Sequence, residues 1–157
     1  MKIAVITFLV FAVFSANVSA GERVPVVVGQ KDKCPVCGMF VQKYSDWTCQ
    51  VVFKDGSYAV FDGAKDMFKY LLDLKRYNPA RKATDVDSVY VTDYYGLRPI
   101  DGYTAQYVIG SDVYGPMGHE LIPFAKSPEA SGFMKDHKGK AILKFHDVTA
   151  ERLKGLD

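Results

Sequence analysis

The order of strand-forming, turn-forming and helical segments constrains this chain most, because the same order occurs twice. Residues 47–53 are mostly apolar, an aspartate–glycine turn follows at 55–56, and residues 58–61 favour a second strand. Asp62 is then expected to cap a helix whose apolar residues recur at helical spacing. Residues 88–92 are rich in β-branched side chains and favour a third strand. The first half therefore predicts the order strand, strand, helix, strand.

The second half repeats this order with different residues. Residues 103–109 and 121–125 favour strands, and the glycine-rich segment 110–118 is expected to connect them. Ser127 is expected to cap the following helix, and residues 140–145 close the pattern with a strand. We therefore predict an α+β fold of duplicated ββαβ units that form two small lobes with antiparallel or mixed sheets.

The chain divides along the same pattern. A single basic residue, Lys2, precedes a short apolar run at 3–14, and Val18-Ser19-Ala20 has the small residues that signal peptidase requires. The run is shorter than the ~20 residues that a membrane-spanning helix needs, and we expect none in the mature chain. The predicted segments are a signal peptide (1–20), an N-terminal extension (21–33), the first unit (34–94), a junction (95–102), the second unit (103–147) and a tail (148–157).

Composition excludes several classes of protein. The chain has 157 residues and is 48% hydrophobic, which is typical of a globular domain and not of a disordered one. The balance of 20 basic against 18 acidic residues gives a net charge of +2, whereas a nucleic-acid-binding protein normally has a basic excess. Three cysteines are too few for a dense disulfide framework. We therefore expect a globular protein that does not bind nucleic acid.

The motif Cys34-Pro-Val-Cys37-Gly-Met39 contains the most reactive side chains of the sequence. Two thiolates at this spacing can bind one ion across a tight turn, and the thioether of Met39 is a further soft donor. Soft sulfur ligands select Cu(I) over hard cations. The motif therefore favours a Cu(I) site, although the same spacing also serves zinc sites, redox pairs and disulfides.

These alternatives stay open, and each makes its own demand on the sequence. A structural zinc site usually has four cysteine or histidine ligands, and the sequence has no second pair at matched spacing. A thioredoxin-like redox pair is expected at the start of an amphipathic helix, which does not follow this motif. An oxidising compartment would favour a disulfide between Cys34 and Cys37, or from either to Cys49.

The second half offers a matching group of donors in the segment Gly115-Pro-Met117-Gly-His119. A methionine in a glycine–proline loop is unusual for core packing, and both the thioether of Met117 and the imidazole of His119 can bind Cu(I). By contrast, Met67 and Met134 lie on apolar helix faces and are predicted to be core residues, as is Cys49 within a strand. No order of residues typical of a hydrolase or phosphate-binding site is present, so we expect a binding protein and not an enzyme.

The sequence resembles the NosL family, the copper-binding accessory proteins of nitrous oxide reductase. The matching features occur in family order over nearly the whole mature chain. They are Cys34-Pro-Val-Cys37-Gly-Met39, Trp47, Phe61-Asp62, Tyr90-Val-Thr-Asp93-Tyr94, Ala105-Gln-Tyr-Val108, Gly110-Ser111, Pro116-Met117-Gly118 and Phe124.

The resemblance implies a periplasmic Cu(I) metallochaperone, with a fold similar to the duplicated unit described above. It implies metal binding at Cys37, Met39 and Met117, with Cys34 and His119 as further candidates. The implied partners are nitrous oxide reductase and its membrane ABC-type copper-maturation system, although a paralogue could supply a different target. Many family members are lipoproteins with a cysteine after the signal, and none is seen at that place here.

Overall fold

The computed structural model describes residues 24–156. The predicted signal peptide at 1–20 lies outside these residues. Within the described part of the chain, no helix combines the length and the apolar character needed to cross a membrane.

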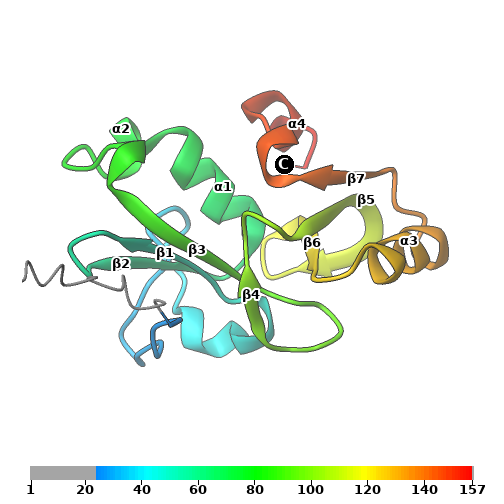
Figure 1. Ribbon diagram of the computed structural model, residues 1–157, viewed down its shortest axis with the longest axis horizontal. Coiled ribbons are helices and arrows are strands. Elements are labelled where there is room, and N and C mark those ends of the chain that lie inside the picture. Colours follow the sequence, from blue (N-terminus) through cyan, green and yellow to red (C-terminus); the bar gives the residue numbers. More distant parts are fainter. Residues whose placement is uncertain (1–23, 157) are drawn as a thin grey trace, which may run out of the picture.

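The first half forms an antiparallel sheet with the strand order β2-β1-β3-β4 (Figure 1). Cys49 of the central strand β1 pairs with Phe61 of β2 on one side and with Val91 of β3 on the other. The helix α1 connects β2 to β3 across the sheet. The elements are β1 (Cys49–Phe53), β2 (Tyr58–Phe61), α1 (Ala64–Leu72), α2 (Leu74–Tyr77), β3 (Val86–Thr92) and β4 (Pro99–Asp101).

The second half has the same topology, with the strand order β6-β5-β7 and α3 between β6 and β7. Gln106 of the central strand β5 pairs with Phe124 of β6 and with Lys144 of β7. The prediction of an α+β fold with duplicated ββαβ units is therefore confirmed. The elements are β5 (Gln106–Gly115), β6 (Gly118–Phe124), α3 (Ser127–Asp136) and β7 (Ala141–Lys144).

Two segments that were expected to be connections contain strands. The predicted junction 95–102 includes β4, which pairs with the edge of β3. The expected connection at 110–118 is mostly a hairpin, because β5 extends to Gly115 and β6 begins at Gly118. Gly110 has a φ of 72° within an irregular part of β5, so its glycine permits a bulge and does not end the strand.

The two predicted helix caps are wrong. The residue that caps α1 is Gly63 and the one that caps α3 is Lys126, and neither makes a side-chain capping bond. The carboxylate of Asp62 instead accepts a hydrogen bond from Cys37, and the hydroxyl of Ser127 accepts one from the side-chain amide of Gln106. Both side chains are thus used in contacts with distant parts of the sequence.

Several short helices lie between and after these elements, and one of them positions the ring of Trp47. Trp47 was expected in a strand, but it ends the 3-10 helix η1, and its ring lies 6.2 Å from that of Tyr94. The remaining short elements are η1 (Val41–Trp47), η2 (Ala83–Asp85), η3 (Phe145–Asp147) and α4 (Ala150–Lys154).

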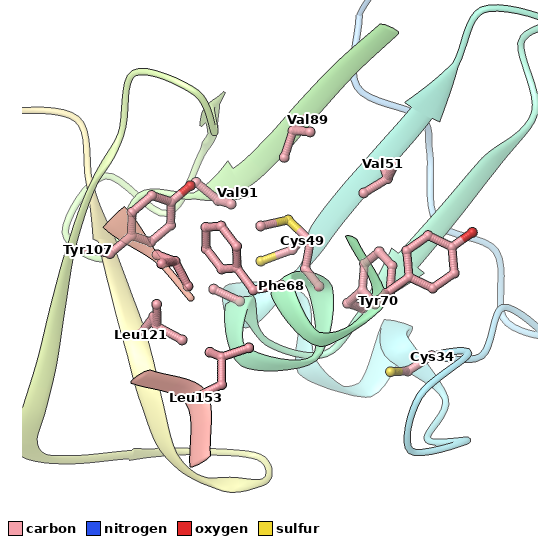
Figure 2. Close-up of a cluster of buried hydrophobic side chains, with 14 of the residues drawn as sticks. Cys34, Cys49, Val51, Phe68, Tyr70, Val89, Val91, Tyr107, Leu121 and Leu153 are labelled. Carbon is pink, nitrogen blue, oxygen red and sulfur yellow. The ribbon is translucent and has the colours of Figure 1, made fainter. Parts of the chain in front are cut away.

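The two halves share a hydrophobic core, shown in Figure 2. Phe68 of α1 contacts Tyr107 of β5, with ring centroids 5.0 Å apart, and this contact joins the first half to the second. Cys49 and Met67 are fully buried in this core, which confirms their assignment. Met134 is half-buried against a smaller core cluster beneath α3.

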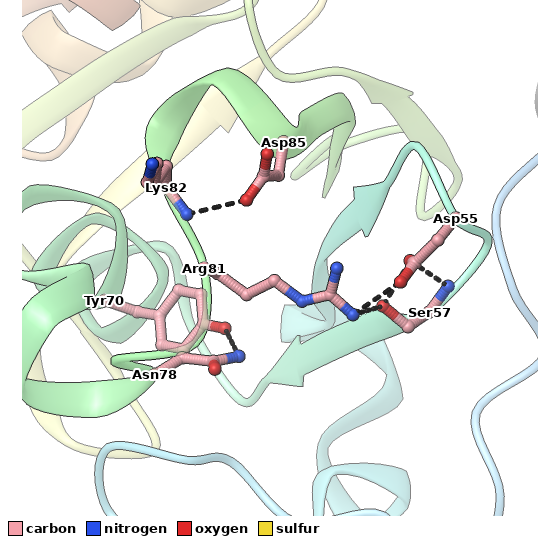
Figure 3. A network of polar contacts seen from close by, with 7 residues as sticks. All are labelled: Asp55, Ser57, Tyr70, Asn78, Arg81, Lys82 and Asp85. Carbon is pink, nitrogen blue, oxygen red and sulfur yellow. Dashed lines mark hydrogen bonds and ion pairs between the residues drawn. The ribbon is translucent and has the colours of Figure 1, made fainter.

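A polar network holds the end of the first sheet at the turn between β1 and β2 (Figure 3). Arg81 donates hydrogen bonds to Asp55 and Ser57 at the turn between β1 and β2. The side-chain amide of Asn78 donates to the hydroxyl of Tyr70 on α1. The segment after α2 is thereby tied to both the sheet and the helix.

Candidate metal centre

Residues 34–39, here called the cysteine loop, form a tight turn. A β-bridge between Lys33 and Phe40 closes its base. Inside it, the Cys34 N–H donates to the Met39 carbonyl at 2.9 Å, and the Gly38 N–H donates to the Cys34 carbonyl at 2.9 Å. Gly38 has a φ of 79°, a left-handed conformation that glycine adopts without steric cost. These bonds hold the two cysteines on one short, well-defined segment.

The cysteine loop lies against the start of α1, where two aspartates meet the thiols. The thiol of Cys34 donates to Oδ2 of Asp66 at 3.3 Å, and the thiol of Cys37 donates to Oδ1 of Asp62 at 3.1 Å. The two sulfur atoms and one oxygen of each carboxylate all lie within 4.8 Å of one another. We call these four residues the thiol–carboxylate cluster.

The cluster holds its thiols in the neutral form. Cys34 is buried and Cys37 is half-buried, and all three cysteines of the chain are free thiols. Burial raises the pKa of Cys34 far above its ordinary value. Burial also raises the pKa of Cys37 to about 12, and the hydrogen bond to Asp62 adds to this effect. A metal ion that binds here must therefore displace thiol protons.

One carboxylate oxygen of the cluster has no hydrogen-bond partner. Oδ2 of Asp62 is buried and accepts no hydrogen bond within the described residues. A buried acceptor normally has a partner, because leaving it unpaired costs about 1–3 kcal/mol. A cation bound among the thiols would supply that partner, so the cluster has the donors and the unpaired charge of a metal site.

The other predicted ligands, Met39, Met117 and His119, are not members of the thiol–carboxylate cluster. Met39 is half-buried at the end of the cysteine loop. Met117 lies at the tip of the β5–β6 hairpin with 42% of its surface exposed, and its carbonyl accepts a hydrogen bond from Nζ of Lys65 at 2.9 Å. His119 is exposed and packs against the ring of Tyr114, with centroids 4.7 Å apart. It is not among the side chains that gather in the thiol–carboxylate cluster.

Sequence reasoning missed Asp62 and Asp66 as members of the site. Asp66 lies in the first turn of α1, whereas Asp62 precedes the capping residue Gly63, so helical spacing alone did not indicate that the two carboxylates meet. The proximity of these aspartates to Cys34 and Cys37 could not be predicted either, because 25 residues separate Cys37 from Asp62 and 32 separate Cys34 from Asp66. Cys49 lies apart from this cluster, since its thiol lies in the core and donates to the Trp47 carbonyl at 3.5 Å.

The duplicated ββαβ units define an α+β protein. Its candidate metal site pairs two thiols of a loop with two carboxylates near the start of a helix. The sequence profile of the NosL family matches residues 25–153. The chain therefore belongs to the NosL family, and the resemblance stated from its motifs is confirmed.

Individual relatives agree with this assignment. A Stutzerimonas stutzeri protein described as "Copper-binding lipoprotein NosL" is 29% identical over 132 residues, which span 79% of this chain and 65% of that protein. The chain thus matches somewhat less than two thirds of that relative's length.

One solved structure supports the fold. The crystal structure of the copper chaperone NosL from Shewanella denitrificans has a TM-score of 0.70 and 22% identity, and the match covers 83% of this chain and 98% of that one. The solution structure of the apo-NosL protein from Achromobacter cycloclastes is 26% identical, with a TM-score of 0.47 and coverage of 67% of this chain and 87% of that one.

Proposed function

We propose that this protein is a Cu(I)-binding metallochaperone whose primary metal donors are the thiolates of Cys34 and Cys37. The observation that carries this proposal is the pair of reduced thiols held within reach of one another beside two carboxylates. Thiolates are the soft ligands that Cu(I) prefers. The Stutzerimonas and Shewanella relatives, described as a copper-binding lipoprotein and a copper chaperone, support the same choice of metal.

The proposed site takes its remaining donors from Met39, Met117 or His119. Met39 belongs to the cysteine loop itself, whereas Met117 and His119 belong to the β5–β6 hairpin. Cu(I) is stable with few ligands, so one of these donors added to the thiolates completes the site. The thiolates themselves supply the negative charge that compensates the bound cation.

Release of the metal is proposed to occur by ligand exchange. Cys37 is half-buried and Met117 is exposed, so part of the site is open to an incoming protein. A low-coordinate ion can accept a ligand from the acceptor before it loses one from the donor. Tight binding is then compatible with fast transfer, and the protein acts as a carrier and not as an enzyme.

The proposed acceptor is nitrous oxide reductase, together with the membrane ABC-type system that matures its copper centres. The proposed compartment is the periplasm, reached through cleavage of an N-terminal signal peptide. This assignment of acceptor and compartment depends on membership of the NosL family. A copper carrier for another target is the alternative that shares every feature of the site.

The transfer experiment uses the anaerobically prepared Cu(I)-loaded protein and copper-free nitrous oxide reductase. After the two proteins are separated, copper is measured in each, and the control supplies the same Cu(I) as a soluble chelator complex. The expected result is copper in the reductase and recovery of its activity above the control. Transfer no greater than from the chelator would reject this acceptor.

Zinc is a second candidate metal, and the two carboxylates favour it. Two thiolates and two carboxylates provide the four donors of a tetrahedral zinc site. Analysis of copper and zinc in the same anaerobic preparation, followed by competition between the two ions, decides between them. A thiol–disulfide redox role is disfavoured because reactive cysteines have a lowered pKa, whereas the pKa of each motif thiol is raised.

A further inference from the structure

Lys65 is a buried cation at the first turn of α1. Only 3% of its surface is exposed. Its Nζ donates to the Met117 carbonyl at 2.9 Å and to the Leu156 carbonyl at 3.1 Å. Burying an ammonium group is costly unless it is hydrogen-bonded and its charge is balanced. The side chain thus joins α1 to the tip of the β5–β6 hairpin and to the C-terminal segment.

Glu120 of β6 makes the reciprocal contact. Its buried carboxylate accepts hydrogen bonds from the backbone N–H groups of Lys65 and of Leu121. Gly63 permits this approach, because a Cβ there would lie 3.0 Å from Cδ of Glu120 and closer still to its Oε2. The backbone of α1 and the start of β6 are therefore held together by hydrogen bonds from two buried polar side chains, consistent with their contact in the fold (Figure 1).

The segment 62–66, at and just before the start of α1, carries both carboxylates of the thiol–carboxylate cluster. Asp66, the residue after Lys65, accepts the hydrogen bond of the Cys34 thiol. Asp62, three residues before Lys65, accepts that of the Cys37 thiol. The start of α1 thus contacts the cysteine loop through its aspartates and the β5–β6 hairpin through Lys65.

We propose that Lys65 is a positioning residue that fixes the backbone of Met117 beside the thiol–carboxylate cluster, so that the Met117 thioether joins Cys34 and Cys37 in binding Cu(I). This inference rests on the proposed function. Met117 has an exposed side chain at a hairpin tip, and its own carbonyl is the atom that Lys65 holds. Loss of that bond removes a contact between the hairpin tip and α1, whereas the hydrogen bonds of the two thiols do not involve Lys65.

The test is a double-mutant cycle on Cu(I) affinity, measured anaerobically against a competing chelator. Lys65→Met keeps most of the aliphatic volume but removes the hydrogen bonds to the Met117 and Leu156 carbonyls, and Met117→Ala removes the thioether. Each single variant is expected to lose affinity by about 10–100-fold, the usual effect of losing a group that supports a metal site. The double variant is expected to bind no more weakly than Met117→Ala. Lys75→Met, at an exposed site on α2, is the matched control and is expected to bind like the wild type.

X-ray absorption of the copper-loaded proteins gives a readout that a purely structural role would not change. The inference predicts that Lys65→Met loses the same thioether sulfur as Met117→Ala and keeps its thiolate sulfurs. If Lys65→Met does not fold, Lys65→Gln replaces it, because its amide retains a donor for one carbonyl.

The outcomes separate this inference from the proposed function. Wild-type Cu(I) affinity in Lys65→Met would overturn the positioning role. The role would also be overturned if Lys65→Met lowered the Cu(I) affinity of the Met117→Ala variant as much as it lowers that of the wild type. Wild-type affinity in Met117→Ala would overturn it as well, while leaving the thiols as the site. Failure of the wild-type protein to bind Cu(I) would instead reject the proposed function.

Discussion

Each thiol of the cluster is paired with one carboxylate, Cys34 with Asp66 and Cys37 with Asp62. These pairs keep the thiols protonated and oriented, and they leave Oδ2 of Asp62 unpaired. At the scale of single residues, the site is therefore prepared for a cation that takes the place of the thiol protons. The cysteine pair was visible in the sequence as a motif, whereas its aspartate partners became visible only in the folded chain.

Metal uptake is expected to depend on pH. Since burial raises the pKa of Cys37 to about 12, the thiol is neutral between about pH 6 and about pH 8, and Cu(I) must displace its proton. The apparent affinity should then rise about tenfold per pH unit for each proton released. Chelator competition over this range measures the slope. An affinity that does not change with pH would show that the thiolates are not the donors.

The reactivity of Cys37 should increase when Asp62 loses its charge. Asp62→Asn keeps an oxygen that can accept the thiol hydrogen bond but removes the carboxylate that adds to the raised pKa of Cys37. We expect alkylation by iodoacetamide to become about two- to tenfold faster in the metal-free protein. Mass spectrometry of the modified peptide gives the rate at Cys37. Asp55→Asn, at the exposed turn between β1 and β2, is the control and should leave it unchanged. A slower reaction in Asp62→Asn would contradict the pairing.

At the scale of elements, alternating and helical patterns predicted the order of the segments well. Residues 58–61 form β2 as expected, and the helix that follows places Met67 and Phe68 in the core. The short strand β4 was missed because three residues that begin with a proline at a sheet edge have no recognisable period. The extension of β5 was missed because glycine normally indicates a turn, whereas here the strand passes an irregularity after Ile109 and pairs with β6 again at Tyr114.

The contact between α1 and β6 makes Gly63 sensitive to a single methyl group. Its φ of 179° is open to any residue, so the cost of Gly63→Ala comes only from the clash with the Glu120 carboxylate. We expect the variant to lower the free energy of unfolding by about 1–3 kcal/mol in urea titrations.

The matched substitution is Gly132→Ala within α3, where a Cβ would meet no atom within 4 Å. Replacing a glycine inside a helix by alanine should raise the free energy of unfolding by about 0.5–1 kcal/mol. Similar small effects at both positions would contradict the close approach of Glu120 to Gly63.

At the scale of the whole molecule, the two ββαβ units share a core and are joined by hydrogen bonds from two buried polar side chains. Tyr107 packs on Phe68 across the two halves, and Glu120 and Lys65 lie at the same interface. The repeat of the pattern was evident in the sequence. The way in which the repeats meet was not, because a buried lysine and glutamate are indistinguishable from surface residues until their partners are known.

Glu120 should make the stability of the fold depend on pH. Burial raises its pKa from 4.5 to about 8, so the folded state favours the neutral acid. This contribution is complete below about pH 4.5 and is lost as the pH rises toward about 8, because unfolding releases a proton in that range. The free energy of unfolding should therefore fall across this window, by an amount on the order of a few kcal/mol.

Glu120→Gln should remove this dependence, since its amide oxygen can still accept the N–H bonds of Lys65 and Leu121. Urea unfolding at several pH values measures the slope. Glu151→Gln, at an exposed position on α4, should keep the wild-type slope. A free energy of unfolding that rises with pH over this window, or a Glu120→Gln variant that retains the decrease, would contradict the assignment.

The most direct test of the central claim is anaerobic Cu(I) competition on the wild type and two cysteine variants. Cys37→Ser removes a proposed thiolate ligand, whereas Cys49→Ala removes a thiol that lies in the core and outside the cluster. Cys37→Ser is expected to lose more than about 100-fold in Cu(I) affinity, because loss of a residue that only supports a metal ligand costs about 10–100-fold. Cys49→Ala should bind copper like the wild type. Wild-type affinity in Cys37→Ser would contradict the proposed site.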